Sequence, residues 1–182
     1  TAALHLAYKT AGVGCEDEII TSPITFVATA NAAIYLDATP IFCDVRLDVP
    51  NIDEAQIEGH ISGKTQAIVP VHIAGMTANM EAIGKIGKKH SIPIIEDACH
   101  ALGSSVNGDM VGSCKHSDMT VFSLHPLKSI TTGEGGVITT NSKSSFDFLC
   151  SLRSHGFNKN RKMNVLGYNY RMSDIAASLG LS

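Results

Sequence analysis

Short apolar segments alternate with amphipathic segments along most of the chain, and this alternation limits the possible folds more than any other sequence feature. Apolar runs bounded by turn residues predict strands at residues 17–22, 39–45, 65–72, 92–98, 118–124 and 135–140. Helical patterns predict helices at residues 1–12, 25–37, 52–61, 79–90 and 144–156, and a last helix capped at Ser173. Strands separated by helices indicate βαβ units. We therefore expect an α/β fold with a mostly parallel central sheet flanked by helices.

The composition fits one globular domain or part of a larger one, because 44% of the 182 residues are hydrophobic and 17% are charged. A net charge of −3 gives no electrostatic footprint for nucleic acid, and no apolar run approaches the length of a membrane span. The five cysteines contain no CxxC pair, which argues against a zinc site or a disulfide framework and favours a reducing cytoplasm. We expect no nucleic acid, membrane or metal among the partners.

Ligands of such sheets bind at the carboxyl ends of the strands, and a pair of carboxylates lies at one of these ends. Glu96 and Asp97 close the apolar run at residues 92–98. Alternation places their side chains on opposite sides of the strand, and we expect Asp97 to face the ligand. A buried carboxylate needs a partner, and the protonated ring nitrogen of a cofactor is one possibility. Capping of a following turn or helix is the other interpretation of Asp97.

One lysine stands in a stiff loop after the strand predicted at residues 118–124. Lys128 follows Pro126, which fixes the backbone and keeps the residue before it out of helical geometry. A lysine held near buried groups can act as a nucleophile toward an aldehyde. A solvated loop lysine is the alternative. The glycines of the "TTGEGG" run that follows could let a ligand approach the backbone, or could simply form a hairpin-like turn.

Further residues could bind a flat, phosphorylated ligand. Thr1 and Ala2 begin the first predicted helix, whose free N–H groups could hold a phosphate, and Ser123 could add a hydroxyl. Phe26 stands between a strand and a helix, where its ring could stack on a cofactor or belong to the core. Plain helix capping is the alternative role for Thr1. Near the carboxyl end of the chain, Asn169 lies in a polar and aromatic stretch that is typical of a contact surface.

Several common chemistries lack their motifs. The chain has no GxSxG elbow of a hydrolase and no GxGxxG after its first strand, as a dehydrogenase would have. No group of His, Cys and Asp residues has the spacing of a metal site. His100 and His125 could act as acid–base residues, but their positions alone do not assign them a role.

The order of these features resembles the DegT/StrS-type nucleotide-sugar aminotransferases. The resemblance rests on "EDACHALG", "VHIAGM", "LRSHG", "LGYNYRMSDIAASLGL" and above all "HPLKSITTGEGG", and it is weakest at about residues 48–64 and 157–165. It implies pyridoxal 5'-phosphate as the cofactor and the aspartate-aminotransferase-like fold type I. The subgroup to which the chain is most similar aminates a UDP-linked 4-keto-6-deoxy amino sugar on the route to pseudaminic acid.

The resemblance also implies a role for each candidate residue. Lys128 would hold the cofactor as a Schiff base and move a proton, and Asp97 would pair with the pyridinium nitrogen. His100 would lie near the ring hydroxyl and Phe26 would stack on the ring. Asn169 would reach the phosphate in the neighbouring subunit of a homodimer with shared active sites. The phosphate of the same subunit would be held by Thr1, Ala2 and Ser123.

By this resemblance, residues 1–182 would form the cofactor-binding large domain, without an N-terminal segment and the C-terminal small domain. The implied reaction transfers an amino group, usually from glutamate, to a keto group of a nucleotide-linked deoxy sugar. A related branch that removes a hydroxyl has histidine where this chain has Lys128, which favours amino transfer. A non-catalytic or regulatory fragment that binds cofactor or a partner without turnover is the alternative. A lyase or desulfurase of the same fold would use the same lysine.

Overall fold

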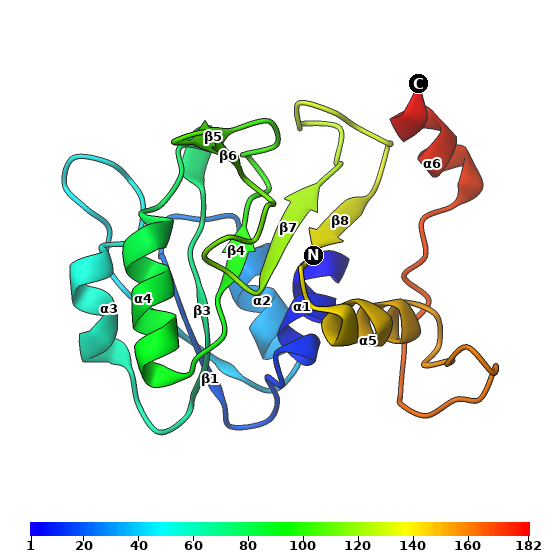
Figure 1. Cartoon of the computed structure of the whole chain (residues 1–182), viewed down its shortest axis with the longest axis horizontal. Coiled ribbons are helices and arrows are strands. Elements are labelled where there is room, and N and C mark those ends of the chain that lie inside the picture. Colours follow the sequence, from blue (N-terminus) through cyan, green and yellow to red (C-terminus); the bar gives the residue numbers. More distant parts are fainter.

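The computed structural model describes residues 1–182, which form one mixed sheet between two layers of helices (Figure 1). The sheet has two three-stranded parts, ordered β2-β1-β3 and β4-β7-β8. Two isolated parallel bridges, Ile68 to Ile94 and Val71 to Asp97, join β3 to β4. The strands are β1 (Glu18–Thr21), β2 (Thr39–Phe42), β3 (Thr65–Val69), β4 (Ile95–Asp97), β7 (Met119–Ser123) and β8 (Gly136–Thr139).

Helices cover both faces of this sheet. Figure 1 shows α3 and α4 on one side and α1, α2 and α5 on the other, with α6 beyond the edge strand β8. No helix combines the length and the apolar character needed to cross a membrane. The helices are α1 (Ala2–Thr10), α2 (Ala28–Ile34), α3 (Glu54–His60), the short 3-10 turn η1 (Ile73–Gly75), α4 (Met80–His90), α5 (Lys143–Arg153) and α6 (Asp174–Leu181).

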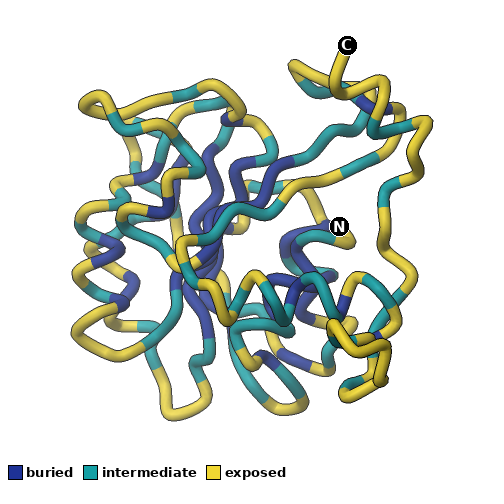
Figure 2. The backbone as a smooth tube through the Cα atoms, turned by 45° about the vertical axis from the view of Figure 1, so that its right-hand side comes forward, coloured by how far each residue is buried: buried dark blue, intermediate teal, exposed yellow.

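The strands divide the apolar core into two clusters, because neighbouring side chains on a strand point to opposite faces. In β1, Ile19 packs in the cluster beneath α1, α2 and α5, whereas Ile20 packs in the cluster beneath α3 and α4. Both side chains are fully buried. Figure 2 shows this burial in the central strands and α1, while the C-terminal segment is mainly exposed or half-buried.

The predicted strands and helices all form, and the α/β fold is confirmed. The boundaries differ where a turn interrupts the pattern: β2 ends at Phe42, before Asp44, and α2 begins only at Ala28. At the edge, β8 pairs antiparallel with β7 because a loop rather than a crossover helix connects them.

The sequence analysis did not include a small hairpin, β5 (Ser105–Val106) and β6 (Asp109–Met110). Asn107 and Gly108 form its turn, with φ values of 51° and 85°. An Asn-Gly pair suits a two-residue hairpin turn because both residues accept positive φ. The signal was therefore present in the sequence.

Candidate active site

Asp97 lies at the carboxyl end of β4 and is 5% exposed. Its Oδ2 accepts a hydrogen bond of 2.7 Å from the Thr29 hydroxyl, and its Oδ1 accepts one of 3.2 Å from the Cys99 N–H. Thr29 Oγ1 also lies 2.7 Å from Thr25 Oγ1, so Thr25 can donate to Thr29 while Thr29 donates to Asp97. None of the ion pairs in the chain includes Asp97. A buried carboxylate held only by neutral donors is suited to receive a cationic group from a ligand.

Burial and the Asp97 carboxylate raise the pKa of two neighbouring groups, the Tyr8 hydroxyl and the Cys99 thiol. Burial and the Asp97 carboxylate together raise the pKa of the Tyr8 hydroxyl well above its ordinary value. This hydroxyl donates a hydrogen bond of 2.9 Å to the Thr29 carbonyl and so supports the residue that binds Asp97. Burial and Asp97 likewise raise the pKa of the Cys99 thiol, whereas the Lys128 ammonium lowers it. Cys99 therefore lies within the electrostatic influence of both Asp97 and Lys128.

Lys128 lies in the loop between β7 and β8, and β7 is the direct neighbour of β4 in the sheet. The backbone of this loop is closed at its base, where Leu124 N–H donates to the Gly135 carbonyl at 2.9 Å and Thr132 N–H donates to the Leu124 carbonyl at 3.0 Å. Lys128 N–H itself donates to the His125 carbonyl at 2.9 Å. The Lys128 side chain is half-buried and forms no ion pair with the chain.

Gly133 and Gly135 of the "TTGEGG" run belong to this closed loop, and Gly136 begins β8. A Cβ atom at Gly135 would come 2.4 Å from Thr132 Oγ1 and 2.7 Å from Met172 Cε, so only glycine fits there without a shift. The run leads directly into the antiparallel strand β8, which confirms the hairpin-like turn.

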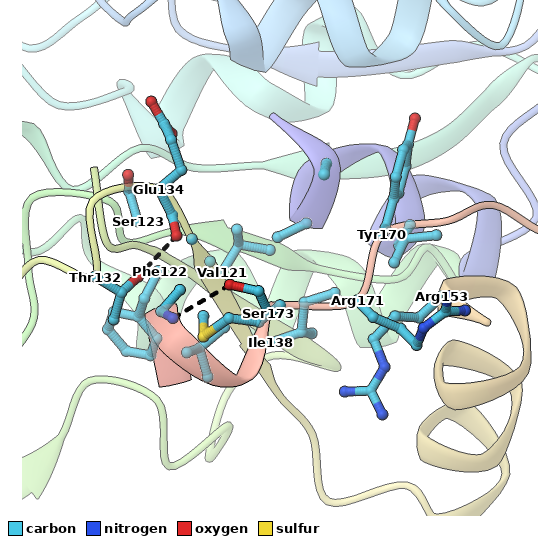
Figure 3. A pocket seen from close by; sticks show the side chains of 18 of the residues that line it. Val121, Phe122, Ser123, Thr132, Glu134, Ile138, Arg153, Tyr170, Arg171 and Ser173 are labelled. Atoms are coloured by element: carbon cyan, nitrogen blue, oxygen red, sulfur yellow. Dashed lines mark hydrogen bonds between the residues drawn. The ribbon is translucent and has the colours of Figure 1, made fainter. Parts of the chain in front are cut away.

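A cavity of about 1300 Å³ opens beside this loop (Figure 3). Three predicted phosphate-binding residues, Thr1, Ala2 and Ser123, line it, and so does Cys99. In Figure 3, Ser123, Thr132 and Glu134 lie toward one end of the view, while Arg153 and Arg171 lie toward the other. The cavity thus joins the start of α1, the carboxyl end of β7 and the residues that follow Asp97.

The start of α1 has the features of an anion site. Thr1 precedes the helix, but its side chain makes no capping hydrogen bond, which contradicts the plain capping role. The exposed hydroxyl and the first N–H groups of α1 are then available to an anion in the cavity.

Five of the predicted site residues lie outside the lining of this cavity. Phe26 is 69% exposed, so its ring is not part of the core. His100 is exposed and its Nδ1 accepts from Ala74 N–H at 3.4 Å, which turns the ring toward η1. Asn169 is exposed and pairs through its backbone with Ser154. Asp97 and Lys128 are the other two. Their roles toward a cofactor stay predictions.

A second buried carboxylate, Glu96, was not assigned a role from the sequence. Its Oε2 lies 2.7 Å from Nε2 of the fully buried His72. Its Oε1 accepts hydrogen bonds from Ser117 and, at 2.8 Å, from Thr120. Burial opposes ionisation of Glu96, but the hydrogen bonds from His72 and Ser117 outweigh it and lower the pKa. His72 is the last residue of the predicted strand at residues 65–72, so its place at a strand end was a usable signal.

The donor set fits pyridoxal 5'-phosphate. Asp97 offers a buried carboxylate without a cation for a ring nitrogen, and Lys128 offers a primary amine one strand away. Thr1 and Ser123 offer hydroxyls beside the free N–H groups of α1 for a phosphate. These groups belong to two neighbouring strand ends and one helix start, as a single bound ring requires.

The chain is similar to proteins that are named as sugar aminotransferases. Residues 1–182 match the model of the DegT/DnrJ/EryC1/StrS aminotransferase family. Over 100% of its length the chain is 44% identical to a UDP-4-amino-4,6-dideoxy-N-acetyl-beta-L-altrosamine transaminase of Campylobacter jejuni, and 40% identical to a GDP-perosamine synthase of Caulobacter vibrioides. It covers 49% of each of these proteins and so spans about half the length of the curated relatives it matches.

The solved structure of Helicobacter pylori PseC, an aminotransferase involved in the biosynthesis of pseudoaminic acid, superposes on the chain with a TM-score of 0.89. The two sequences are 37% identical, and the match covers 98% of this chain and 50% of that one. The fold expected from the sequence is therefore that of known aminotransferases.

Proposed function

The chain belongs to the DegT/DnrJ/EryC1/StrS aminotransferase family, and from this premise we propose that it is the cofactor-binding large domain of a pyridoxal-phosphate-dependent aminotransferase. The observation that supports this most is Asp97, a buried carboxylate without a cationic partner in the chain, one strand away from the loop of Lys128. The cofactor, when bound, supplies an electron sink for the substrate carbon from which a proton is removed.

The residues of the chain would bind and orient the cofactor and move the proton. Asp97 Oδ2, oriented by Thr29, would hold the proton on the ring nitrogen and so keep the ring electron-deficient. Lys128 Nζ would be the amine that holds the cofactor at its aldehyde carbon, with water as the leaving group, and it would carry the proton that moves between substrate and cofactor carbons. Thr1, Ala2 and Ser123 hold the phosphate at the start of α1. Phe26 would stack on the ring and His100 would lie beside the ring hydroxyl.

The substrate that we propose is a nucleotide-linked deoxy sugar with a keto group, and glutamate is the proposed amino donor. The similarity to the C. jejuni transaminase favours a UDP-linked 4-keto-6-deoxy amino sugar, as on the route to pseudaminic acid. The GDP-perosamine synthase is nearly as similar, so GDP-linked sugars belong in the same assay. The proposed whole enzyme is a homodimer in which Asn169 reaches the phosphate bound by the partner subunit.

Borohydride reduction tests the proposal on the full-length protein. Incubation with pyridoxal 5'-phosphate should give a visible absorbance band, and reduction should attach the cofactor to the peptide that contains Lys128. Lys128→Ala should lose this adduct, whereas Lys143→Ala, which removes an exposed lysine paired with Asp147, should keep it. An adduct absent from the wild-type protein, or formed on another lysine, would refute the proposed role of Lys128.

A turnover assay separates amino transfer from the alternatives. The full-length protein, glutamate and a UDP-linked 4-keto-6-deoxy sugar should yield the amino sugar and 2-oxoglutarate in equal amounts. A protein that forms the Lys128 adduct but transfers no amino group to UDP- or GDP-linked keto sugars would favour the non-catalytic alternative. Release of sulfur from cysteine or cleavage of threonine would favour a desulfurase or lyase.

A further inference from the structure

The sheet has a seam between β3 and β4. On each side of it the strands pair in continuous ladders, β1 with β3 and β4 with β7. Across it, only the two isolated bridges join the backbones. The residues proposed to contact the cofactor lie on both sides: Phe26 follows β1, whereas Asp97 ends β4 and Lys128 follows β7. The alignment of the two halves therefore sets how the stacking ring lies relative to the carboxylate and the amine.

One residue at the carboxyl end of the seam contacts two consecutive residues of β4. His72, beyond the end of β3, donates from its backbone N–H to the Asp97 carbonyl at 3.0 Å. Its ring lies 2.7 Å from Glu96 Oε2. Nδ1 accepts from the Ala78 N–H at 3.2 Å, so Nε2 carries the proton and donates it to Glu96. His72 thus fixes both the position and the orientation of the end of β4.

Glu96 extends this connection to the next strand. It accepts hydrogen bonds from Thr120 in β7 and from Ser117 just before β7. The loop of Lys128 follows this strand. On the opposite face of the sheet, Thr29 from α2 crosses the same seam to bind Asp97. The seam is therefore closed by side chains on both faces, at the strand ends where the proposed cofactor site lies.

We propose that His72 and Glu96 are positioning residues that align the two halves of the sheet and so hold Asp97 and Lys128 in the geometry that the cofactor requires. This inference rests on the proposed function. The two residues touch neither cofactor nor substrate; they act through the backbone of Asp97 and through β7. Loss of either side chain should loosen the seam on one face while Thr29 still binds Asp97 on the other.

Cofactor affinity of the full-length protein provides the test. Pyridoxal 5'-phosphate titrated by its visible absorbance should bind about tenfold more weakly to Glu96→Ala and to His72→Ala, because small misplacements of a site cost tenfold or more. The double variant should bind no more than about twofold more weakly than the worse single variant, because both changes remove one connection. Glu96→Gln should stay within about threefold of wild type, since its amide oxygen can still accept from His72 and its NH₂ can donate to the hydroxyls.

Another Glu–His pair provides the matched control. Glu58 and His90 also lie 2.8 Å apart, but they join α3 to α4 on the surface. Glu58→Ala should leave the affinity for the cofactor unchanged. A purely structural role for His72 and Glu96 would lower thermal stability in Glu96→Ala without changing the affinity or the absorbance band of the folded fraction.

If the alanine variants do not fold, a double variant that combines His72→Leu with Glu96→Met replaces them. Apolar side chains of similar size often preserve stability when they replace a buried ion pair. This variant should fold and bind the cofactor about tenfold more weakly, in line with the single changes. Wild-type affinity in any folded variant that lacks the connection would overturn the inference. Failure of the wild-type protein to form the Lys128 adduct would instead overturn the proposed function, and this inference with it.

Discussion

Glu96 and Asp97 are consecutive buried carboxylates whose environments differ. Glu96 is satisfied within the chain by three donors, His72, Ser117 and Thr120. Asp97 has only Thr29 and the Cys99 N–H, and no cation. Glu96, whose hydrogen bonds are all made within the chain, is suited to hold the strand in place. Asp97, which lacks a cationic partner in the chain, is suited to bind a ligand. This division of roles follows from the alternation of side chains along one strand.

The pH dependence of stability should reveal the Glu96 network. The pKa of Glu96 is lower in the folded protein than its ordinary value of 4.5, so its ionised form stabilises the fold. That contribution is complete above about pH 4.5 and is lost as the pH falls through the lower folded pKa. Thermal unfolding of the wild type and of Glu96→Gln between pH 7 and pH 3 should show a steeper loss for the wild type below about pH 4.5. Parallel curves would contradict this assignment.

For single residues, the sequence predicted where a side chain lies in the fold better than it predicted its hydrogen-bond partners. Alternation correctly separated Asp97 from Glu96, and the position of Lys128 after a buried strand was correct. The hydrogen-bond partners Thr29 and His72 were not found, because they approach β4 from elements that are 68 and 24 residues away along the chain. Such contacts depend on strand order, which local patterns do not determine.

The elements follow local rules of capping and close packing. The side chain of Asn79 caps α4 by accepting from the Ala82 N–H, and the last turn of α4 contains the basic residues Lys88, Lys89 and His90, which suit the negative end of the helix dipole. The presence of the helices could therefore be predicted from the sequence. The boundaries of α2 and β2 and the direction of β8 could not. These details depend on turns, and a turn responds to the packing on both of its sides.

Two helical glycines should respond in opposite ways to the same substitution. At Gly59 in α3, a Cβ atom meets nothing within 4 Å, so Gly59→Ala should raise the free energy of unfolding by about 0.5–1 kcal/mol through helix propensity. At Gly87 in α4, a Cβ atom would lie 2.7 Å from Ile94 Cδ1 and 2.8 Å from the Ile92 carbonyl oxygen. Gly87→Ala should therefore lower the free energy of unfolding by about 1–3 kcal/mol through overpacking.

Urea denaturation of both glycine variants measures these changes, provided that the m-value stays constant. Neither glycine contacts the candidate site, so cofactor affinity should not change in Gly59→Ala. A stabilised Gly87→Ala variant would show that α4 can move away from β4 and its preceding loop.

At the scale of the whole molecule, the proposed site residues do not all line one cavity of this chain. Thr1, Ala2 and Ser123 share the large cavity, while Asn169 is exposed on the segment between α5 and α6. Arg171 of this segment and Arg153 at the end of α5 lie beside the cavity (Figure 3), and Ile175 of α6 also lines it. An exposed amide that does not reach its own cavity is consistent with the proposed role in a partner subunit.

Complementation between inactive variants tests that arrangement in the full-length enzyme. Lys128→Ala should inactivate the site of its own subunit, and Asn169→Asp should impair the site of the partner by placing a negative charge beside a phosphate. When the two are unfolded together and refolded as an equal mixture, half of the dimers should contain one chain of each kind. Each mixed dimer then has one site with both wild-type residues, so activity should return to about a quarter of the wild-type value. If Asn169 acted on the phosphate of its own subunit, no site in the mixed dimer would contain both residues, and the mixture would stay as inactive as its components.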